Sequence, residues 1–175
     1  FDADYRDEVF EVEAPFDGEG KSLVKTTNRF SGIDWATENT AIVYDYWWDT
    51  RNRKAYIFNP SNSSSKPKVL YDRNYQDIYS DPGSFLKARN AFNKSVLMLH
   101  KGNAYLRGAG FSKEGQFPFI DRLNITTLKK SRVYQSKYTN KVEAIQDYNP
   151  TTNELIVRIE SPTEYPNYYS KKTNG

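Results

Sequence analysis

Short β-type segments recur along this chain, and turn sequences separate them. Residues 8–13 read E-V-F-E-V-E, in which apolar and charged side chains nearly alternate, as they do in a half-buried strand. No window carries apolar residues at a sustained helical spacing, and the best helical candidate, residues 84–92, has room for only a turn or two. The sequence therefore predicts an all-β fold.

The composition and the turn signals support this prediction. The chain contains 14 Tyr, 10 Phe and 3 Trp in 175 residues, and so many aromatic side chains favour strands and argue against disorder. Turn sequences rich in Asn, Pro and Gly occur at residues 59–62, 81–83 and 149–153. We expect strands at residues 8–13, 22–27, 32–35, 40–48, 53–59, 68–72, 85–89, 95–100, 103–107, 117–124, 130–135, 142–147, 154–160 and 165–170.

The expected strands fall into groups that resemble repeated meanders. Four segments between residues 33 and 72 form one group, and further groups open at Phe85 and Val142, so the openings are ~50–60 residues apart. This long repeat favours a β-propeller, with a sandwich of short strands as the alternative all-β fold. We expect residues 1–175 to form a single partial β-propeller of about three to three and a half blades, each an antiparallel four-stranded meander. Its uncovered terminal blade faces would favour self-association.

Charge and cysteine content exclude several classes of function. The 25 Lys and Arg residues exceed the 22 Asp and Glu residues by a net +3, and the nearest approach to a basic run is Lys129, Lys130 and Arg132. Such dispersed charge argues against nucleic acid as a partner. The absence of Cys excludes disulfides and thiol nucleophiles, and no apolar run approaches the ~20 residues of a membrane helix. The opening F-D-A-D is polar, so we expect no signal peptide, and the lack of an initiator Met suggests an excised or processed piece.

Several words of the sequence resemble the β-propeller of the prolyl oligopeptidase family of serine peptidases, in its glutamyl-endopeptidase-like branch. The most informative of these sequence segments is E-S-P-T-E-Y-P-N-Y-Y at residues 160–169. The others are R-F-S-G-I-D-W at residues 29–35, W-W-D-T-R at 47–51, L-Y-D-R at 70–73, D-I-Y-S-D-P-G at 77–83 and G-F-S-K-E-G-Q-F-P-F-I-D-R at 110–122.

This resemblance implies a two-part enzyme, in which a propeller covers an α/β-hydrolase domain and limits access to a Ser-Asp-His triad. The branch is associated with cleavage after Glu, some relatives are dipeptidyl aminopeptidase-like, and bacterial relatives are often periplasmic. The hydrolase domain is absent from this sequence, so we expect the chain alone to be inactive. Its implied partners are that domain and the peptide substrate, with no cofactor. The alternative is a free-standing all-β binding or scaffold module for a glycan or a protein.

The residues themselves offer no catalytic machinery. A G-x-S-x-G elbow is missing, and Gly110-Phe111-Ser112 starts like one without the second Gly or a following helix. His100, the single histidine, ends an apolar segment with no nucleophile beside it. The acidic residues Asp72, Asp77 and Asp81 are expected to cap turns and not to bind a metal, because their spacing fits no calcium loop.

Five residues are candidates for contact with a substrate: Trp47, Trp48, Arg51, Arg122 and Arg158. Adjacent residues in a strand point to opposite faces, so one tryptophan is expected to pack and the other to face a channel or peptide. The arginines could receive an acidic side chain, although Arg122 beside Asp121 and Arg158 near Glu160 also suggest structural ion pairs.

A further expectation concerns the closing segment. Pro162 and Pro166, together with Tyr165, Tyr168 and Tyr169, predict a rigid and packed turn.

Overall fold

The computed structural model of the chain describes residues 3–173, so Phe1 and Asp2 of the polar opening lie outside the described residues. Within this range every regular element is a β-strand and all strand pairs are antiparallel, which confirms the predicted fold class. The chain divides into two compact units, Phe1–Asp77 and Ile78–Gly175. Among residues 3–173 no helix has the length and apolar character needed to cross a membrane.

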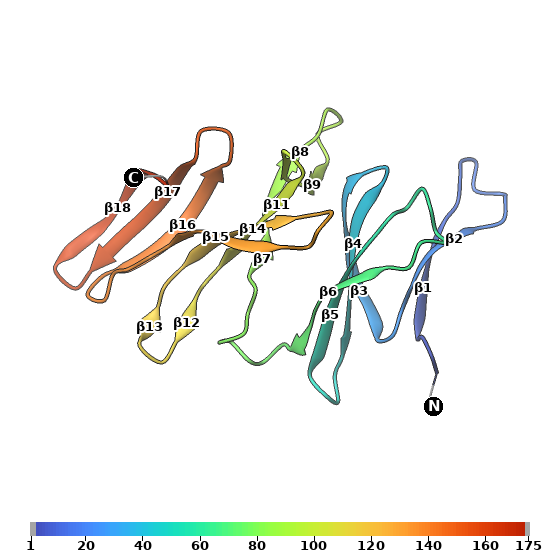
Figure 1. Cartoon of the computed structure of the whole chain (residues 1–175), viewed down its shortest axis with the longest axis horizontal. Helices are drawn as coiled ribbons and strands as arrows, with labels where there is room; N and C mark the ends of the chain where they lie inside the picture. Colours follow the sequence, from blue (N-terminus) through green and yellow to red (C-terminus); the bar gives the residue numbers. More distant parts are fainter. Residues whose placement is uncertain (1–2, 174–175) are drawn as a thin grey trace. The chain divides into compact units, whose positions relative to one another are not determined.

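The first unit combines a hairpin with a four-stranded sheet, seen in blue to green in Figure 1. Strands β3 to β6 pair in sequence order, which confirms the four-strand meander expected between residues 33 and 72. The hairpin is β1 (Asp7–Glu11) and β2 (Lys21–Thr26), and the sheet is β3 (Arg29–Thr37), β4 (Thr40–Trp47), β5 (Asn52–Phe58) and β6 (Lys68–Asn74).

The core of the first unit lies between the hairpin and one face of this sheet. Directly opposite residues of an antiparallel pair share a face, and Val43 pairs with Tyr56 in this way. Both are buried in one cluster with Leu23 and Val24 of the hairpin. Burial of these side chains, at ~25 cal/mol per Å² of apolar surface, holds the hairpin on the sheet.

The second unit contains two larger sheets and two short hairpins, seen in green to red in Figure 1. One sheet has the order β10-β11-β14-β15, with β7 also paired to β11, and the other has the order β16-β17-β18. Strands β8 and β9 form one short hairpin, and β12 and β13 form the other. The strands are β7 (Ser84–Phe85), β8 (Lys87–Arg89), β9 (Ser95–Leu97), β10 (Leu99–His100), β11 (Asn103–Gly108), β12 (Phe111–Ser112), β13 (Gly115–Gln116), β14 (Phe119–Asn124), β15 (Lys130–Gln135), β16 (Val142–Asn149), β17 (Glu154–Ser161) and β18 (Glu164–Lys172).

The helical candidate at residues 84–92 is wrong, and the two strands expected at 85–89 and 95–100 are each interrupted. The chain pairs with β11 through β7 and then changes partner, so that β8 pairs with β9. At the crossover the backbone N–H of Leu86 donates to the carbonyl of Tyr105 (2.8 Å), and that of Met98 donates to the carbonyl of Leu86 (2.9 Å). Both side chains pack against the core, which accounts for the break in strand geometry.

The core of the second unit lies between its two sheets. Leu155 and Val157 of β17 are fully buried in one cluster with Tyr105 of β11 and Ile120 of β14. The guanidinium of Arg107 also joins the sheets, because it donates to the carbonyls of Ile145 (3.1 Å) and Gln146 (2.9 Å) at a bulge in β16.

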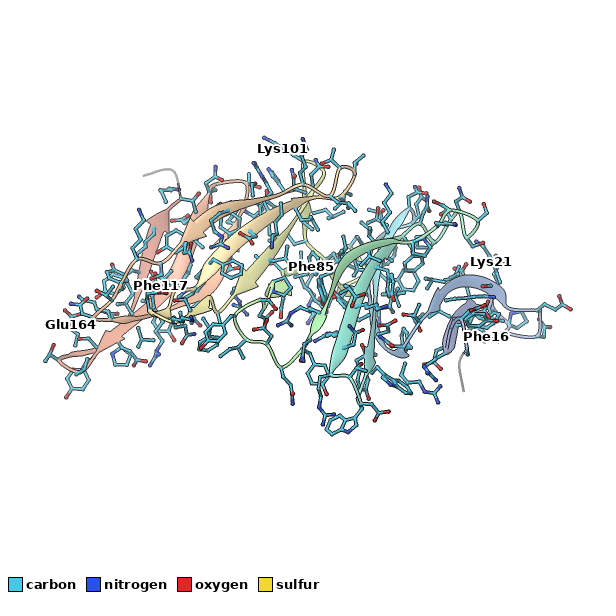
Figure 2. The ribbon with its side chains drawn as sticks, turned by 60° about the horizontal axis from the view of Figure 1, so that its bottom comes forward. Phe16, Lys21, Phe85, Lys101, Phe117 and Glu164 are labelled. Atoms are coloured by element: carbon cyan, nitrogen blue, oxygen red, sulfur yellow. The ribbon has the colours of Figure 1, made fainter. Side chains whose placement is uncertain are left out.

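The apolar run E-L-I-V-R-I of β17 is buried on one face only. Leu155, Val157 and Ile159 face the core, whereas Ile156 is 37% exposed. The following strand, β18, is exposed along nearly its whole length. The packed turn expected there is therefore wrong: Tyr165 is 95% exposed, beside Glu164, which Figure 2 labels at the start of β18.

Candidate functional site

The turn between β4 and β5 brings Trp48 and Arg51 together. The Trp48 side chain is 65% exposed, and the guanidinium carbon of Arg51 lies 3.9 Å from the centroid of its indole ring. The backbone N–H of Arg51 donates to the Trp48 carbonyl (3.2 Å), and the Arg51 guanidinium donates to the same oxygen. Arg51 has φ +57, so the turn itself sets the position of this cation over the ring. We call this pair the Trp48–Arg51 platform.

Trp47 is arranged differently from its neighbour. It is the last residue of β4, it is partly buried, and the guanidinium carbon of Arg6 lies 4.0 Å from its ring centroid. Because β4 ends at Trp47, the direction of Trp48 follows from the turn and not from strand alternation. One tryptophan is thus packed and the other is exposed, and an arginine contacts each ring.

The two arginines predicted in the second unit lie in different sheets. Arg158 of β17 donates to both carboxylate oxygens of Glu160 (2.9 and 2.8 Å), so the structural ion pair considered for it is present. Arg122 of β14 is exposed and does not pair with Asp121, because adjacent strand residues face opposite sides. Burial raises the pKa of Tyr105, the residue opposite Arg122, and the positive charge of Arg122 opposes that rise.

A buried glutamate that the sequence did not single out organises the end of β18. The Glu143 side chain is buried, and it accepts hydrogen bonds from the Tyr134 hydroxyl (2.8 Å) and the Lys171 ammonium (2.5 Å). Burial, together with the Glu143 carboxylate, raises the pKa of Tyr134 to about 12. Lys171 also donates to the hydroxyls of Tyr134 (3.3 Å) and Tyr138 (3.4 Å), so all three of its donors are used. The cluster is internally satisfied and is best explained as a structural tie.

A second buried carboxylate, Asp121 of β14, is incompletely satisfied. It is 1% exposed, and its Oδ1 accepts a hydrogen bond from Nε of Arg132 at 2.5 Å. Its Oδ2 lies 3.5 Å from Nζ of Lys130, and no donor among residues 3–173 forms a hydrogen bond with it. The same carboxylate lines a pocket of about 330 Å³ with the rings of Phe111 and Phe117. We call this the Asp121 pocket.

A third buried carboxylate lies in the first unit. Asp45 of β4 is 0% exposed and accepts hydrogen bonds from the backbone N–H of Asn28 (3.0 Å), the Asn28 side-chain amide (3.1 Å) and the Tyr56 hydroxyl (3.0 Å). These bonds fix the connection between β2 and β3. Asp45 therefore holds the hairpin in place on the sheet.

Three residues that the sequence analysis weighed for catalysis or metal binding lie in ordinary strands and turns. Ser112 lies in the β12–β13 hairpin, where its hydroxyl donates to the Gly115 carbonyl at 3.1 Å. His100 lies on β10, and its Nδ1 is 3.5 Å from the Thr151 hydroxyl. Asp81 accepts a hydrogen bond from the Gly83 backbone N–H (2.9 Å), as expected for turn capping. Within residues 3–173, no three His, Asp or Glu side chains converge as metal ligands would.

The sequence did contain a weak signal for the carboxylates that were missed. Asp45, Asp121 and Glu143 each lie in a strand next to apolar residues, in Y-D-Y, I-D-R and V-E-A. A charged residue that strand alternation directs towards the interior requires partners, and these partners come from other strands. Sequence spacing alone does not identify them.

Comparison with known proteins gave two related plant proteins. The chain is 35% identical over 181 aligned positions to the protein named "Probable glutamyl endopeptidase, chloroplastic" of Oryza sativa subsp. japonica. This alignment covers 94% of this chain and 19% of the rice protein. The chain is also 31% identical over 180 positions to the protein of the same name of Arabidopsis thaliana. This second alignment covers 93% of this chain and 19% of the Arabidopsis protein. The chain thus spans about a fifth of the length of these curated relatives, and the similarity points to a peptidase-related family.

The other comparisons gave no match: no family model matches the chain, and no solved structure does.

Proposed function

We propose that this chain is the non-catalytic β-propeller portion of a prolyl-oligopeptidase-family serine peptidase. In this role it gates and orients peptide substrates for a separate α/β-hydrolase domain. The observation that carries the proposal is the 35% identity, over 94% of the chain, to a protein named as a glutamyl endopeptidase, of which the chain spans only 19%. Within residues 3–173 every regular element is a strand, so a catalytic α/β domain has to come from another part of the parent protein.

The arrangement of strands supports the propeller part of the proposal. A blade is a four-stranded antiparallel meander, and β3 to β6 form such a meander. The sheet of β10, β11, β14 and β15 supplies a second blade, with β7 completing its first strand. We assign β16 to β18 to a third blade and the β1–β2 hairpin to the outer half of another, which gives about three to three and a half blades. Open faces of the terminal blades would then support self-association.

Within this proposal the Trp48–Arg51 platform is the strongest substrate-facing candidate. An exposed indole with a guanidinium above it offers a peptide both an apolar surface and a cation for an acidic side chain. Arg122 is a second candidate because it is exposed. Trp47 and Arg158 are weaker candidates, since their side chains already contact Arg6 and Glu160 respectively.

The test compares this chain with its full-length parent on peptides that contain Glu. We expect the parent to hydrolyse them, a serine-directed inhibitor to abolish that activity, and the 175-residue chain to give no turnover. Hydrolysis by the chain alone that the inhibitor abolishes would overturn the proposal. A parent coding sequence without a Ser-Asp-His hydrolase domain would overturn it equally.

The alternative is a free-standing binding or scaffold module for a glycan or a protein. The 65% exposure of Trp48 favours it, because exposed aromatic rings serve as stacking surfaces. Glycan-array binding by the chain, lost in Trp48→Ala and kept in Trp35→Ala, would support this alternative.

We also propose an exported, periplasmic location for a bacterial parent protein. Fractionation of cells that produce the parent tests it, and recovery of the parent in the cytoplasmic fraction alone would refute it.

A further inference from the structure

The Asp121 pocket has apolar walls and a buried carboxylate that lacks one hydrogen bond. Asp121 is one of the residues that line the pocket, and its buried Oδ2, 3.5 Å from Nζ of Lys130, receives no hydrogen bond from residues 3–173. A buried acceptor without a donor is costly, and native structures rarely leave one unpaired. The oxygen therefore marks the point where a ligand can supply a donor.

The charges around this oxygen decide which kind of donor fits. Nε of Arg132 lies 2.5 Å from one carboxylate oxygen, and Nζ of Lys130 lies 3.5 Å from the other. Two cations therefore already face a single buried carboxylate. A third cation would be repelled by them, whereas an anion would meet the unpaired oxygen. A neutral N–H donor avoids both penalties.

The walls define the rest of the ligand. The rings of Phe111, Phe117 and Phe119 line the pocket, and the Arg132 guanidinium carbon lies 4.0 Å from the centroid of the Phe119 ring. A volume of about 330 Å³ is at the lower end of the ~300–1,000 Å³ typical of ligand sites, so it suits one or two amino-acid residues.

The loop that carries two of these rings is held in place by its backbone. Gly110 has φ +66, and a Cβ on it would lie 1.9 Å from the carbonyl oxygen of Phe117. The backbone N–H of Phe117 in turn donates to the Gly110 carbonyl at 2.8 Å. Phe117, labelled in Figure 2, and Phe111 are thus anchored from both ends of the short β12–β13 hairpin. The pocket is preformed, which lowers the entropic cost of binding.

We propose that the Asp121 pocket binds a short peptide segment with an apolar side chain. A backbone N–H of the segment donates to Oδ2 of Asp121, and its carbonyl accepts a hydrogen bond from Nζ of Lys130. The apolar side chain packs against the phenylalanine rings. This site is distinct from the Trp48–Arg51 platform, and it does not depend on the proposed peptidase role: a free-standing binding module could contain it equally well.

The first experiment is an NMR titration of the chain with N-acetyl-phenylalanine methylamide. We expect shifts of the backbone amide signals of Gly110, Phe111 and Asp121. An analogue of the probe with both amide nitrogens methylated has no N–H, and we expect it to bind at least tenfold more weakly. Absence of shifts with the parent probe, or equal affinity for the two compounds, would overturn the proposal.

Variants separate the polar contacts from the apolar ones. In Asp121→Asn the Arg132 donor keeps the amide oxygen on its own side, so the amide nitrogen replaces Oδ2 and faces the ligand donor. We expect at least tenfold weaker binding of the parent probe and loss of discrimination against the methylated analogue. Lys130→Met should weaken binding several-fold, whereas Lys129→Met, an exposed neighbour outside the pocket lining, should not.

The apolar wall provides a test that leaves the buried carboxylate intact. Phe111→Ala should weaken binding of the probe at least fivefold, and Phe92→Ala, which removes an 82% exposed ring outside the pocket lining, should not. If Asp121→Asn fails to fold, the Phe111 and Lys130 variants still decide the matter. Unchanged affinity in both, or displacement of the probe by guanidinium chloride at low millimolar concentration, would refute an amide-binding site.

Discussion

Replacing Asp45 by alanine is expected to destabilise the first unit by about 3–5 kcal/mol. The carboxylate is fully buried and accepts three hydrogen bonds shorter than 3.2 Å, from the Asn28 backbone, the Asn28 side chain and the Tyr56 hydroxyl. The side-chain amide of Asn28 keeps Asn52 as an acceptor (2.8 Å), and the Tyr56 hydroxyl keeps Thr27 (2.9 Å). The Asn28 backbone N–H is therefore the donor that loses its partner.

The magnitude combines two losses. An unsatisfied buried backbone N–H costs about 1–3 kcal/mol, and hydrogen bonds to a charged acceptor contribute about 1.5–3 kcal/mol each, partly recovered by the donors that keep another partner. In urea, a unit of this size has an m value of about 1 kcal/mol/M. The midpoint of unfolding should then fall by about 3 M or more.

The assay can observe the first unit alone. All three tryptophans, Trp35, Trp47 and Trp48, lie in it, so tryptophan fluorescence during urea unfolding reports on this unit and not on the second. Asp72→Ala is the matched control: its side chain is 50% exposed on β6 of the same sheet, its ion pair with Lys54 is of the surface kind, and the hydrogen bond it accepts from the Asn52 side chain (2.6 Å) is exposed. It should cost no more than about 1 kcal/mol.

Asp45→Asn tests the reasoning further. It retains one acceptor oxygen in the same shape, so its cost should lie between those of the alanine variant and the Asp72 control. If Asp45→Ala and Asp72→Ala shift the midpoint equally, then the Asp45 hydrogen bonds do not hold the hairpin on the sheet. An Asp45→Asn variant less stable than Asp45→Ala would contradict the accounting of unsatisfied donors.

Three further predictions concern local features. Gly110→Ala should destabilise the second unit by about 1–3 kcal/mol in thermal unfolding, because φ is +66 and the new Cβ meets a backbone oxygen. Gly18→Ala should be nearly neutral, since no heavy atom lies within 4 Å of the position of its Cβ. Burial raises the pKa of Tyr56 to about 12, so the stabilisation by its neutral hydroxyl is complete below pH ~10 and is lost as the pH rises through about 12. Urea unfolding at a series of alkaline pH values should show this loss of stability, and the free energy of unfolding of Tyr56→Phe should fall less steeply with pH. Arg51→Ala should change stability by less than about 1 kcal/mol but should shift the fluorescence of Trp48, and an unchanged spectrum would argue against the stacked pair.

Most strands could be predicted because their signals are local. The alternation of apolar residues and the turn sequences placed β3 to β6 close to their observed bounds, and the apolar run around Ile42 and Val43 in β4 is buried. The interruptions at Leu86 and Met98 could not be predicted in this way. They arise because the chain changes its strand partner there, and the choice of partner depends on segments distant in sequence.

For the candidate sites too, features that depend on nearby residues could be predicted from the sequence, and features that depend on distant strands could not. Trp48 and Arg51 are three residues apart, so one turn brings them together, and a reader of the sequence can select both. Asp121 depends on Arg132 and Lys130 of the next strand, and its pocket needs the β12–β13 hairpin, which the sequence did not suggest. The exposure of Tyr165, against the packed turn we expected, likewise depends on what covers β18.

The sequence by itself determined the class of the fold, the strand segments and the absence of cysteine chemistry, since side-chain alternation, turn residues and composition act over a few neighbouring positions. Tertiary structure alone decided which carboxylates are buried and which partners they have. Asp45, Asp121 and Glu143 look alike in the sequence, yet the first two of them differ in whether every oxygen finds a donor. That difference depends on strand register and on packing between sheets, because a hydrogen bond requires atoms from separate strands to meet within about 3 Å.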